Sequence, residues 1–400
     1  MGGVASGTLG FTTAFLTNSG TASLGNYGSI DSTVVINGAS GTSTFSGTLL
    51  DGSTGKLAIL KSGASTQVLS GTNTYTGGTT VNAGTLALGN ATNTLTDSGA
   101  VTVDGATAIL SIGGNTDTVG AVSLKNGGSI TGTGGTLTGA SFAVEDGSVS
   151  AKLGGAGIAL TKSTSGTVTL SGANTYTGST TITSGTLILS SAGSIGNGAV
   201  AVNGGTLTVN GAVGSGGVTV ANGATLGGNG TIAGAVSIAS GGTLAPGNSP
   251  GILSTGNLSL AAGSSLSAEI TGTGTVAGTN YDQVNVTGTV SLLGNLTLTL
   301  SSYTPTNGHL FFLINNDPGD DITTGFANVN GGSLSNNTEF NLAGNRWFIS
   351  YAANYNGGVG STFTGGNDVA LYAIPEPTTW ILLAVGLTVS VTLRRRRRME

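Results

Sequence analysis

The sequence predicts an all-β protein built as a long parallel β-helix, also called a β-solenoid. Three observations lead to this fold class. Glycine supplies 74 of the 400 residues, and 38% of the chain is hydrophobic while only 7% is charged. A block of 21 residues occurs twice, and leucines recur roughly every 20 residues between short turns.

The composition favours a folded chain over a flexible one. Disordered segments combine low hydrophobicity with high charge, whereas charge is scarce here and Val, Leu, Ile and Ala are plentiful. Because the chain has no cysteine, disulfides and cysteine-based metal or redox sites are excluded. The net charge is −5, and it becomes −8 without residues 374–400, so the chain has no basic stripe and nucleic acid is not an expected partner.

An internal duplication organises the first half of the chain. The block LSGTNTYTGGTTVNAGTLALG begins at Leu69 and returns as LSGANTYTGSTTITSGTLILS at Leu170, with 14 of 21 positions identical. Lys61 and Lys162 keep the same offset of 101. The paired Tyr75 and Tyr176 could stack on sugars, but packing at a corner of the fold is the favoured role.

A shorter period lies within and beyond the duplication. Leucines of one pattern are spaced by 20, 19, 18 and 22 residues, at Leu187, Leu207, Leu226, Leu244 and Leu266. Between them, Asn-Gly and Gly-Gly turns alternate with short runs of apolar and hydroxyl residues, which is typical of half-buried strands. One leucine per repeat in a constant orientation favours stacked parallel coils over antiparallel hairpins. This spacing predicts about 16 to 18 coils.

Four regions follow from these patterns. Residues 1–45 form an atypical N-terminal β segment, which we interpret as a truncated solenoid, and residues 46–300 form the β-helix. Residues 301–372 contain most of the large aromatic residues and form a β-rich cap, because the last coil of a solenoid otherwise leaves an open edge. Residues 373–400 form a separate tail. The first Lys or Arg is Lys56, so no signal-peptide pattern opens the chain, and we expect the reading frame to continue upstream.

The tail predicts one short C-terminal transmembrane helix with its end in the cytoplasm. A Pro-Glu-Pro motif precedes an apolar run that is shorter than the roughly 20 residues of a comfortable span, and an arginine cluster follows. The motif consists of Pro375, Glu376 and Pro377. The membrane segment includes Trp380, Ile381, Leu382, Leu383, Val385, Leu387 and Leu393. The arginine cluster is Arg394, Arg395, Arg396, Arg397 and Arg398.

These three ordered features resemble the PEP-CTERM sorting signal over about 27 residues. The resemblance implies export to the cell envelope, cell surface or exterior, with a transient inner-membrane tail that an exosortase-type membrane protease removes. It also implies an association with extracellular polysaccharide, which such bacteria commonly make.

The duplicated block resembles the passenger-associated transport repeat, also known as the autotransporter-associated β-strand repeat. The segments 242–251 and 281–288 also resemble autotransporter passenger sequence. This resemblance covers roughly residues 40–300 and implies a right-handed parallel β-helix. Autotransporters end in a membrane β-barrel, whereas this chain ends in the tail, so self-translocation is not implied.

The sequence indicates no catalytic site. The single histidine, His309, lies beside a turn and is interpreted as a turn residue. Asp317, Asp320 and Asp321 form the one acidic cluster, which is interpreted as a solvated loop, with calcium binding left open. The predicted function is therefore a non-enzymatic structural or adhesive surface protein without a cofactor or metal. A polysaccharide-active enzyme on a β-helix and a self-transported autotransporter adhesin are the alternatives.

Overall fold

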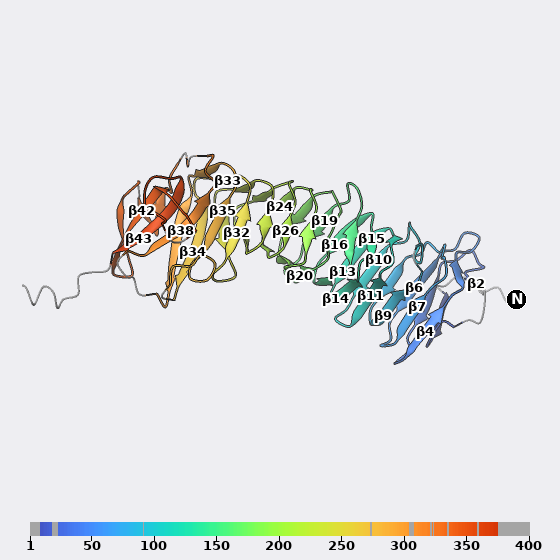
Figure 1. The fold of residues 1–400 in the computed structure, drawn as a ribbon. Helices are drawn as coiled ribbons and strands as arrows, with labels where there is room; N and C mark the ends of the chain where they lie inside the picture. Colours follow the sequence, from blue (N-terminus) through green and yellow to red (C-terminus); the bar gives the residue numbers. More distant parts are fainter. Residues whose placement is uncertain are drawn as a thin grey trace, which may run out of the picture.

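The computed structural model describes residues 9–17, 23–90, 92–272, 274–303, 308–320, 322, 324–333, 336–357 and 360–374. In this part of the chain all regular structure is β, and the strands stack into an elongated rod (Figure 1). The prediction of a parallel β-solenoid is confirmed. The predicted C-terminal helix lies outside the described residues, and within them no helix is long and apolar enough to cross a membrane.

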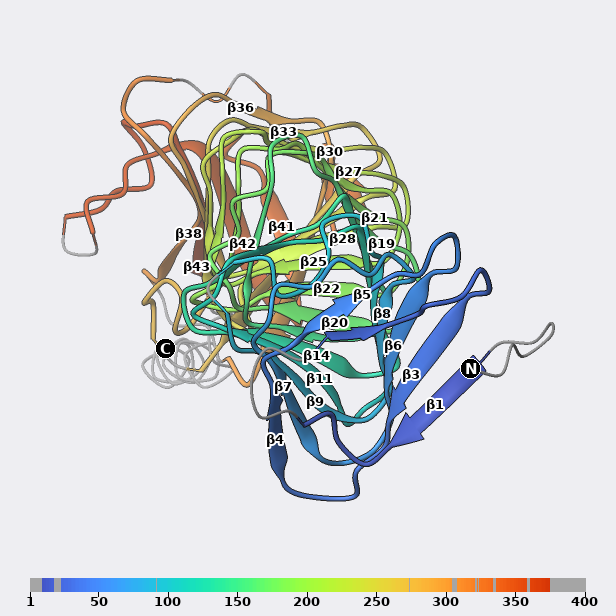
Figure 2. The same ribbon diagram turned by 90° about the vertical axis from the view of Figure 1, so that its right-hand side faces the viewer.

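Two long sheets form two sides of the solenoid, and each coil except those at the two ends contributes one short strand to each of them (Figure 2). Sheet 1 has 14 parallel strands: β1 (Leu9–Thr13), β3 (Ser32–Ile36), β6 (Leu57–Lys61), β8 (Thr79–Val81), β10 (Val101–Asp104), β13 (Ala121–Lys125), β16 (Ser141–Val144), β19 (Leu160–Lys162), β21 (Thr180–Ile182), β24 (Val200–Val202), β27 (Val218–Val220), β30 (Val236–Ile238), β33 (Leu258–Leu260) and β36 (Val290–Leu292).

Sheet 2 has 15 strands, of which only the last pairs antiparallel: β4 (Thr42–Phe45), β7 (Thr66–Leu69), β9 (Gly84–Leu88), β11 (Ala108–Gly113), β14 (Gly128–Gly132), β17 (Gly147–Val149), β20 (Thr167–Leu170), β22 (Thr186–Leu189), β25 (Thr206–Val209), β28 (Thr225–Gly228), β31 (Thr243–Pro246), β34 (Ser265–Thr271), β37 (Asn295–Ser301), β39 (Asn328–Val329) and β40 (Gly332–Ser333).

Shorter strands form the third side. Its main sheet, sheet 3, has nine strands: β23 (Ser194–Ile195), β26 (Ala212–Val213), β29 (Thr231–Ile232), β32 (Ile252–Thr255), β35 (Gln283–Val286), β38 (Leu310–Asn316), β43 (Asp368–Ile374), β42 (Asn345–Ala353) and β41 (Glu339–Leu342). Two smaller parallel sheets precede it: β2 (Ser23–Gly25) with β5 (Thr48–Leu50), and β12 (Asp117–Thr118) with β15 (Thr136–Thr138) and β18 (Lys152–Gly154).

The number of coils is smaller than the sequence spacing predicted. Sheet 1 has 14 strands in the described residues instead of 16 to 18. The reason is that coil length varies: Val200 pairs with Val218, a step of 18 residues, whereas Leu258 pairs with Val290, a step of 32. Long excursions outside the sheets use residues without adding a coil.

The interior is the predicted ladder of aliphatic side chains. Leu187, Leu207, Leu226, Leu244 and Leu266 pair in register along sheet 2, and each is fully buried. Burying one such side chain contributes about 1.5–3 kcal/mol, so a single residue type repeated once per coil supplies a continuous core. The alternate positions of the same strands face outward and are mostly Thr and Ser, which explains the alternating apolar and hydroxyl pattern.

Tight corners between the sheets require glycine. Gly205 has a φ of +70°, and a Cβ placed there would lie 2.2 Å from the carbonyl oxygen of Gly185 in the preceding coil. Only glycine adopts this conformation without strain and leaves room for the neighbouring backbone. The high glycine content therefore reflects the close stacking of successive corners.

Antiparallel strands end the parallel stack. β38 pairs in parallel with β35 on one edge and antiparallel with β43 on the other, and β42 and β41 continue the antiparallel pairing. The indole of Trp347 and the ring of Phe311 are fully buried beneath these strands, 6.0 Å apart. Reversing the strand direction covers the edge that another parallel coil would otherwise occupy.

Candidate functional site

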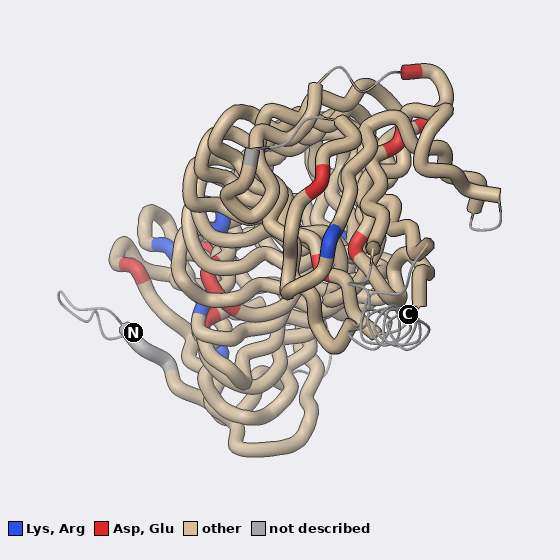
Figure 3. Tube along the Cα trace, turned by 90° about the vertical axis from the view of Figure 1, so that its left-hand side faces the viewer, with Lys and Arg blue, Asp and Glu red and all other residues tan. Residues whose placement is uncertain are grey.

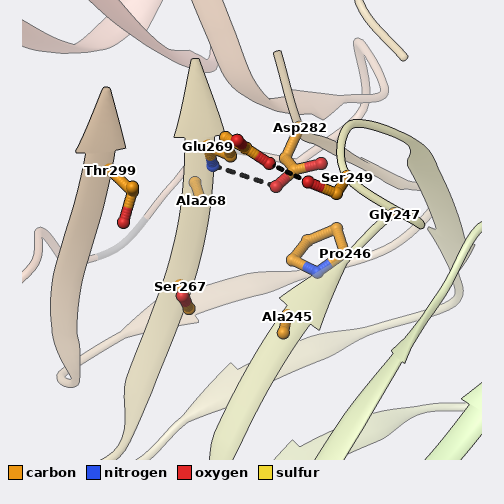
Figure 4. Close-up of a pocket in the computed structure, with 9 residues that line it drawn as sticks. All are labelled: Ala245, Pro246, Gly247, Ser249, Ser267, Ala268, Glu269, Asp282 and Thr299. Carbon is orange, nitrogen blue, oxygen red and sulfur yellow. Dashed lines mark hydrogen bonds between the residues drawn. The ribbon is translucent and has the colours of Figure 1, made fainter. Parts of the chain in front are cut away.

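A hollow of about 320 Å³ opens on the outer face of sheet 2 near its C-terminal end (Figure 4). It is lined by Ala245, Pro246, Gly247, Ser249, Ser267, Ala268, Glu269, Asp282 and Thr299. These residues come from β31, β34 and β37 and from the loop that leaves β31, except Asp282, which directly precedes β35. The hollow exists because the outward-facing residues Ala245 and Ser267 are small.

Glu269 is the more exposed of the two carboxylates at this site. It lies on the outer face of β34, where it is half-buried and pairs in register with Thr299 of the next coil. The hydroxyl of the exposed Ser249 donates a hydrogen bond to Glu269 Oε2, so the two side chains point toward one another across the hollow (Figure 4).

Asp282 holds the two walls of the hollow together. Its Oδ1 accepts the backbone N–H of Gly251 at 2.8 Å, and its Oδ2 accepts the backbone N–H of Glu269 at 2.9 Å. The Asp282 side chain is 5% exposed, and this burial raises its pKa to about 6 against the opposing effect of the two amide hydrogen bonds. The charge of Glu269 is a smaller contributor to this raised pKa of Asp282.

The loop between β31 and β32 is closely fitted. Gly247 has a φ of +88°, and a Cβ there would lie 2.4 Å from Asp282 Oδ1 and 2.3 Å from the nitrogen of Gly251. Ser249 also adopts a left-handed conformation, with a φ of +68°. Non-glycine residues rarely adopt this conformation, and such positions concentrate at functional sites.

The sequence interpretation did not identify Glu269 and Asp282 as a pair. It singled out the segments 242–251 and 281–288 separately, and the structure brings them together through the bond between Asp282 and Gly251. The chain that leaves β34 turns back alongside the end of that strand, where the Asp282 N–H donates to the Glu269 carbonyl. No spacing in the sequence predicts this return. The one available signal was that both segments resemble the same kind of passenger sequence.

The duplicated blocks have identical internal roles in their two copies. Lys61 and Lys162 are fully buried, and their ammonium groups donate to backbone carbonyls of their own coil and the next. Burial lowers the pKa of both lysines. The hydroxyl groups of Tyr75 and Tyr176 hydrogen-bond to Thr79 and Thr180 inside the core.

The two tyrosines are fully buried, so they pack inside the fold and cannot stack on a sugar from solution. The corner-packing interpretation of these residues is therefore favoured by the structure. The paired lysines are likewise internal cross-links between coils, since their ammonium groups bind corner carbonyls and do not reach the surface.

The remaining candidates take structural positions or lie outside the described residues. His309 Nδ1 lies 3.0 Å from the hydroxyl of Tyr303 beside the aromatic cluster of the cap. The backbone carbonyls of Asp317 and Asp320 accept hydrogen bonds from the Asn367 side chain. Asp321 and residues 375–400 of the predicted tail lie outside the described part. Ala373 and Ile374, which the sequence interpretation assigned to the tail, instead end strand β43.

Within the described residues, no group of three or more His, Asp or Glu side chains is placed to hold a metal ion. Since Asp321 lies outside them, calcium binding at the acidic cluster stays open. The nearby Asp368 uses both carboxylate oxygens on backbone amides, those of Asn316 and Tyr355. Burial raises the pKa of Asp368. This carboxylate therefore joins strand β43 to its neighbours.

The parallel β-solenoid and its repeats are similar to those of autotransporter-like extracellular passengers and adhesins. Residues 59–88 and 160–189 each match the passenger-associated-transport-repeat family. In the structure each match runs from a sheet 1 strand to the second sheet 2 strand that follows, β6 to β9 and β19 to β22. No curated protein matches the chain.

Proposed function

We propose that this chain is a non-enzymatic structural or adhesive protein of the cell surface or exterior, exported and processed through its C-terminal sorting tail. The observation that carries the proposal is the pair of passenger-associated repeats built into a long solenoid. Charged residues are sparse along the rod (Figure 3). The outward strand positions carry mainly hydroxyl groups. Such a surface suits contact with an uncharged, hydroxyl-rich extracellular polysaccharide.

The partners in this proposal are an exosortase-type membrane protease, the membrane before processing, and extracellular polysaccharide. The Pro375–Pro377 motif would be read by the protease, residues 380–393 would hold the precursor in the bilayer, and the arginine cluster would keep its end cytoplasmic. A plain membrane anchor needs only the last two of these features.

The experiment that separates sorting from anchoring is the Glu376→Ala variant. Mass spectrometry of the mature C-terminus should find cleavage between residues 374 and 379 in the natural chain and an uncleaved, membrane-bound precursor in the variant. A matched control, Thr378→Ala, leaves the motif intact and should be cleaved. An intact C-terminus at Glu400 in the natural chain would refute processing.

A polysaccharide-active enzyme is the second candidate, because Glu269 and Asp282 are two carboxyl groups that line one hollow. Glycoside hydrolysis needs one carboxyl group as acid and another as base or nucleophile. Both oxygens of Asp282 already accept backbone N–H bonds within the fold. The geometry therefore favours binding over hydrolysis.

A further inference from the structure

The hollow beside Glu269 differs from the rest of the outer face of sheet 2. Across the strands β20 to β37 of this sheet, the outward positions are mostly Thr and Ser, and Glu269 is the one charged residue. Glutamate is depleted in strands, and here it stands next to a second carboxylate, which is electrostatically unfavourable. A charge kept at such a position points to a ligand.

The groups around the hollow define the chemistry of that ligand. An ionised carboxylate accepts about four hydrogen bonds and donates none, and Ser249 occupies one of these sites on Glu269. The hydroxyl groups of Ser267 and Thr299 both donate and accept. The complementary molecule is one that carries several adjacent O–H groups.

Other classes of ligand fit less well. The lining contains no Lys, Arg or His, so an anionic group would meet the Glu269 carboxylate without a compensating cation. The lining also contains no large apolar or aromatic side chain, which disfavours an apolar ligand. The volume of about 320 Å³ lies at the lower end of the range for small-molecule sites, which suits a single small unit of a longer molecule. Because the hollow opens to solvent, the rest of that molecule can extend from the bound unit on either side.

We propose that this hollow is a binding subsite for one uncharged sugar unit of an extracellular polysaccharide, with the Glu269 carboxylate accepting hydrogen bonds from neighbouring sugar hydroxyls. The hydroxyls of Ser267 and Thr299 complete the polar contacts. Asp282 is a positioning residue: it fixes the backbone of Glu269 and the loop that carries Ser249 through its bonds to two amides. This inference rests on the proposed surface function and names its partner.

The test uses the full chain in a detergent without sugar groups. The probes are neutral gluco-, manno- and galacto-tetrasaccharides, a tetrasaccharide containing glucuronic acid, and calcium chloride alone, with binding followed by NMR titration. At least one neutral tetrasaccharide should bind, and Glu269→Ala should weaken that binding by about tenfold or more, since a charge-assisted hydrogen bond is lost. Glu145→Ala, which removes the same charge elsewhere, should bind like the natural chain.

A second variant guards against misfolding. Thr299→Val keeps the size and β preference of the side chain and removes only the hydroxyl, so it should weaken the same neutral probe by a smaller factor with an unchanged circular dichroism spectrum. The subsite proposal is overturned if no neutral probe binds, if only the charged sugar or calcium binds, or if Glu269→Ala binds as well as the natural chain. Tail cleavage and surface display should be normal in Glu269→Ala. If the natural chain itself is neither cleaved nor displayed, the proposed function is contradicted, whatever the result of the sugar titrations.

Discussion

Asp117 Oδ2 accepts the backbone N–H of Leu95 from the preceding coil at 2.8 Å. In two other coils an amide oxygen takes this role. Asn73 Oδ1 accepts the backbone N–H of Leu49 at 2.8 Å, and Asn174 Oδ1 accepts that of Leu153 at 2.9 Å. All three side chains are buried at the third side of the solenoid. A carboxylate therefore occupies in one coil the place that a neutral amide occupies in two others.

Stability around Asp117 should fall as the pH rises. Burial, with a smaller effect from Asp97, raises the pKa of Asp117 to about 6 from its ordinary value of 3.8. The folded state binds the Asp117 proton more tightly than the unfolded state does. The contribution of this proton to the free energy of unfolding is therefore present below pH 4, is lost between about pH 4 and pH 6, and is absent at higher pH. The loss should be on the order of 1–3 kcal/mol, measured as protection of the Leu95 amide from hydrogen exchange.

Asp117→Asn should remove this dependence, because a neutral amide can accept the Leu95 bond without a buried charge. Protection at Leu95 should then be higher at pH 7 than in the natural chain and nearly constant from pH 4 to pH 7. The reciprocal variant, Asn174→Asp, should introduce a pH-dependent loss in its own coil. If Leu95 is equally protected in Asp117→Asn and in the natural chain at pH 7, the ionised Asp117 carboxylate does not destabilise its coil, and the prediction is wrong.

Leu207→Asp or Leu226→Asp should disrupt neighbouring coils without unfolding the whole rod. Both leucines are fully buried, and an unpaired buried carboxylate costs several kcal/mol. Since each coil contacts only its neighbours, damage should extend over a few coils. Limited proteolysis should show new cleavage near the substitution. Thr206→Asp, on the outward side of the same strand, should remain resistant, and complete loss of β signal in the leucine variants would argue against a solenoid of semi-independent coils.

Lys162→Ala should loosen the corner between β19 and β20. The buried ammonium group donates to the carbonyls of Thr164 and Ser184, and its removal leaves these acceptors and a cavity. The expected destabilisation is about 2–4 kcal/mol, measured by local hydrogen exchange. Lys162→Met fills the cavity and should recover part of this loss, while Lys152→Ala at a half-buried position should have little effect.

Asp282→Ala should release the loop that closes the hollow. The amides of Gly251 and Glu269 lose their acceptor, and each buried unsatisfied group costs about 1–3 kcal/mol. Hydrogen exchange should therefore accelerate at both amides, while Leu207 in the middle of the rod stays protected. Asp282→Asn retains one acceptor oxygen and should release only one of the two amides. Unchanged exchange in Asp282→Ala would show that Asp282 does not hold the loop.

Local regularities were sufficient for the fold class. The repeated leucine spacing and the duplicated block predicted stacked parallel coils, because each coil must bury the same kind of side chain in the same place. The number of coils was overestimated, since the step from Leu258 to Val290 cannot be read from a mean period. The PEP-CTERM tail remains a prediction that the described residues do not test.

The sequence by itself determined the β-solenoid, because periodic burial needs only a periodic pattern of apolar, hydroxyl and turn residues. Only the tertiary structure decided which polar residues meet. Asp282 reaches Gly251 and Glu269 because an irregular excursion returns it to a neighbouring coil, and the buried bond of Asp117 to Leu95 depends on how coils of unequal length align. Contacts of this kind depend on the three-dimensional course of loops that have no period, so they appear only when the chain is folded.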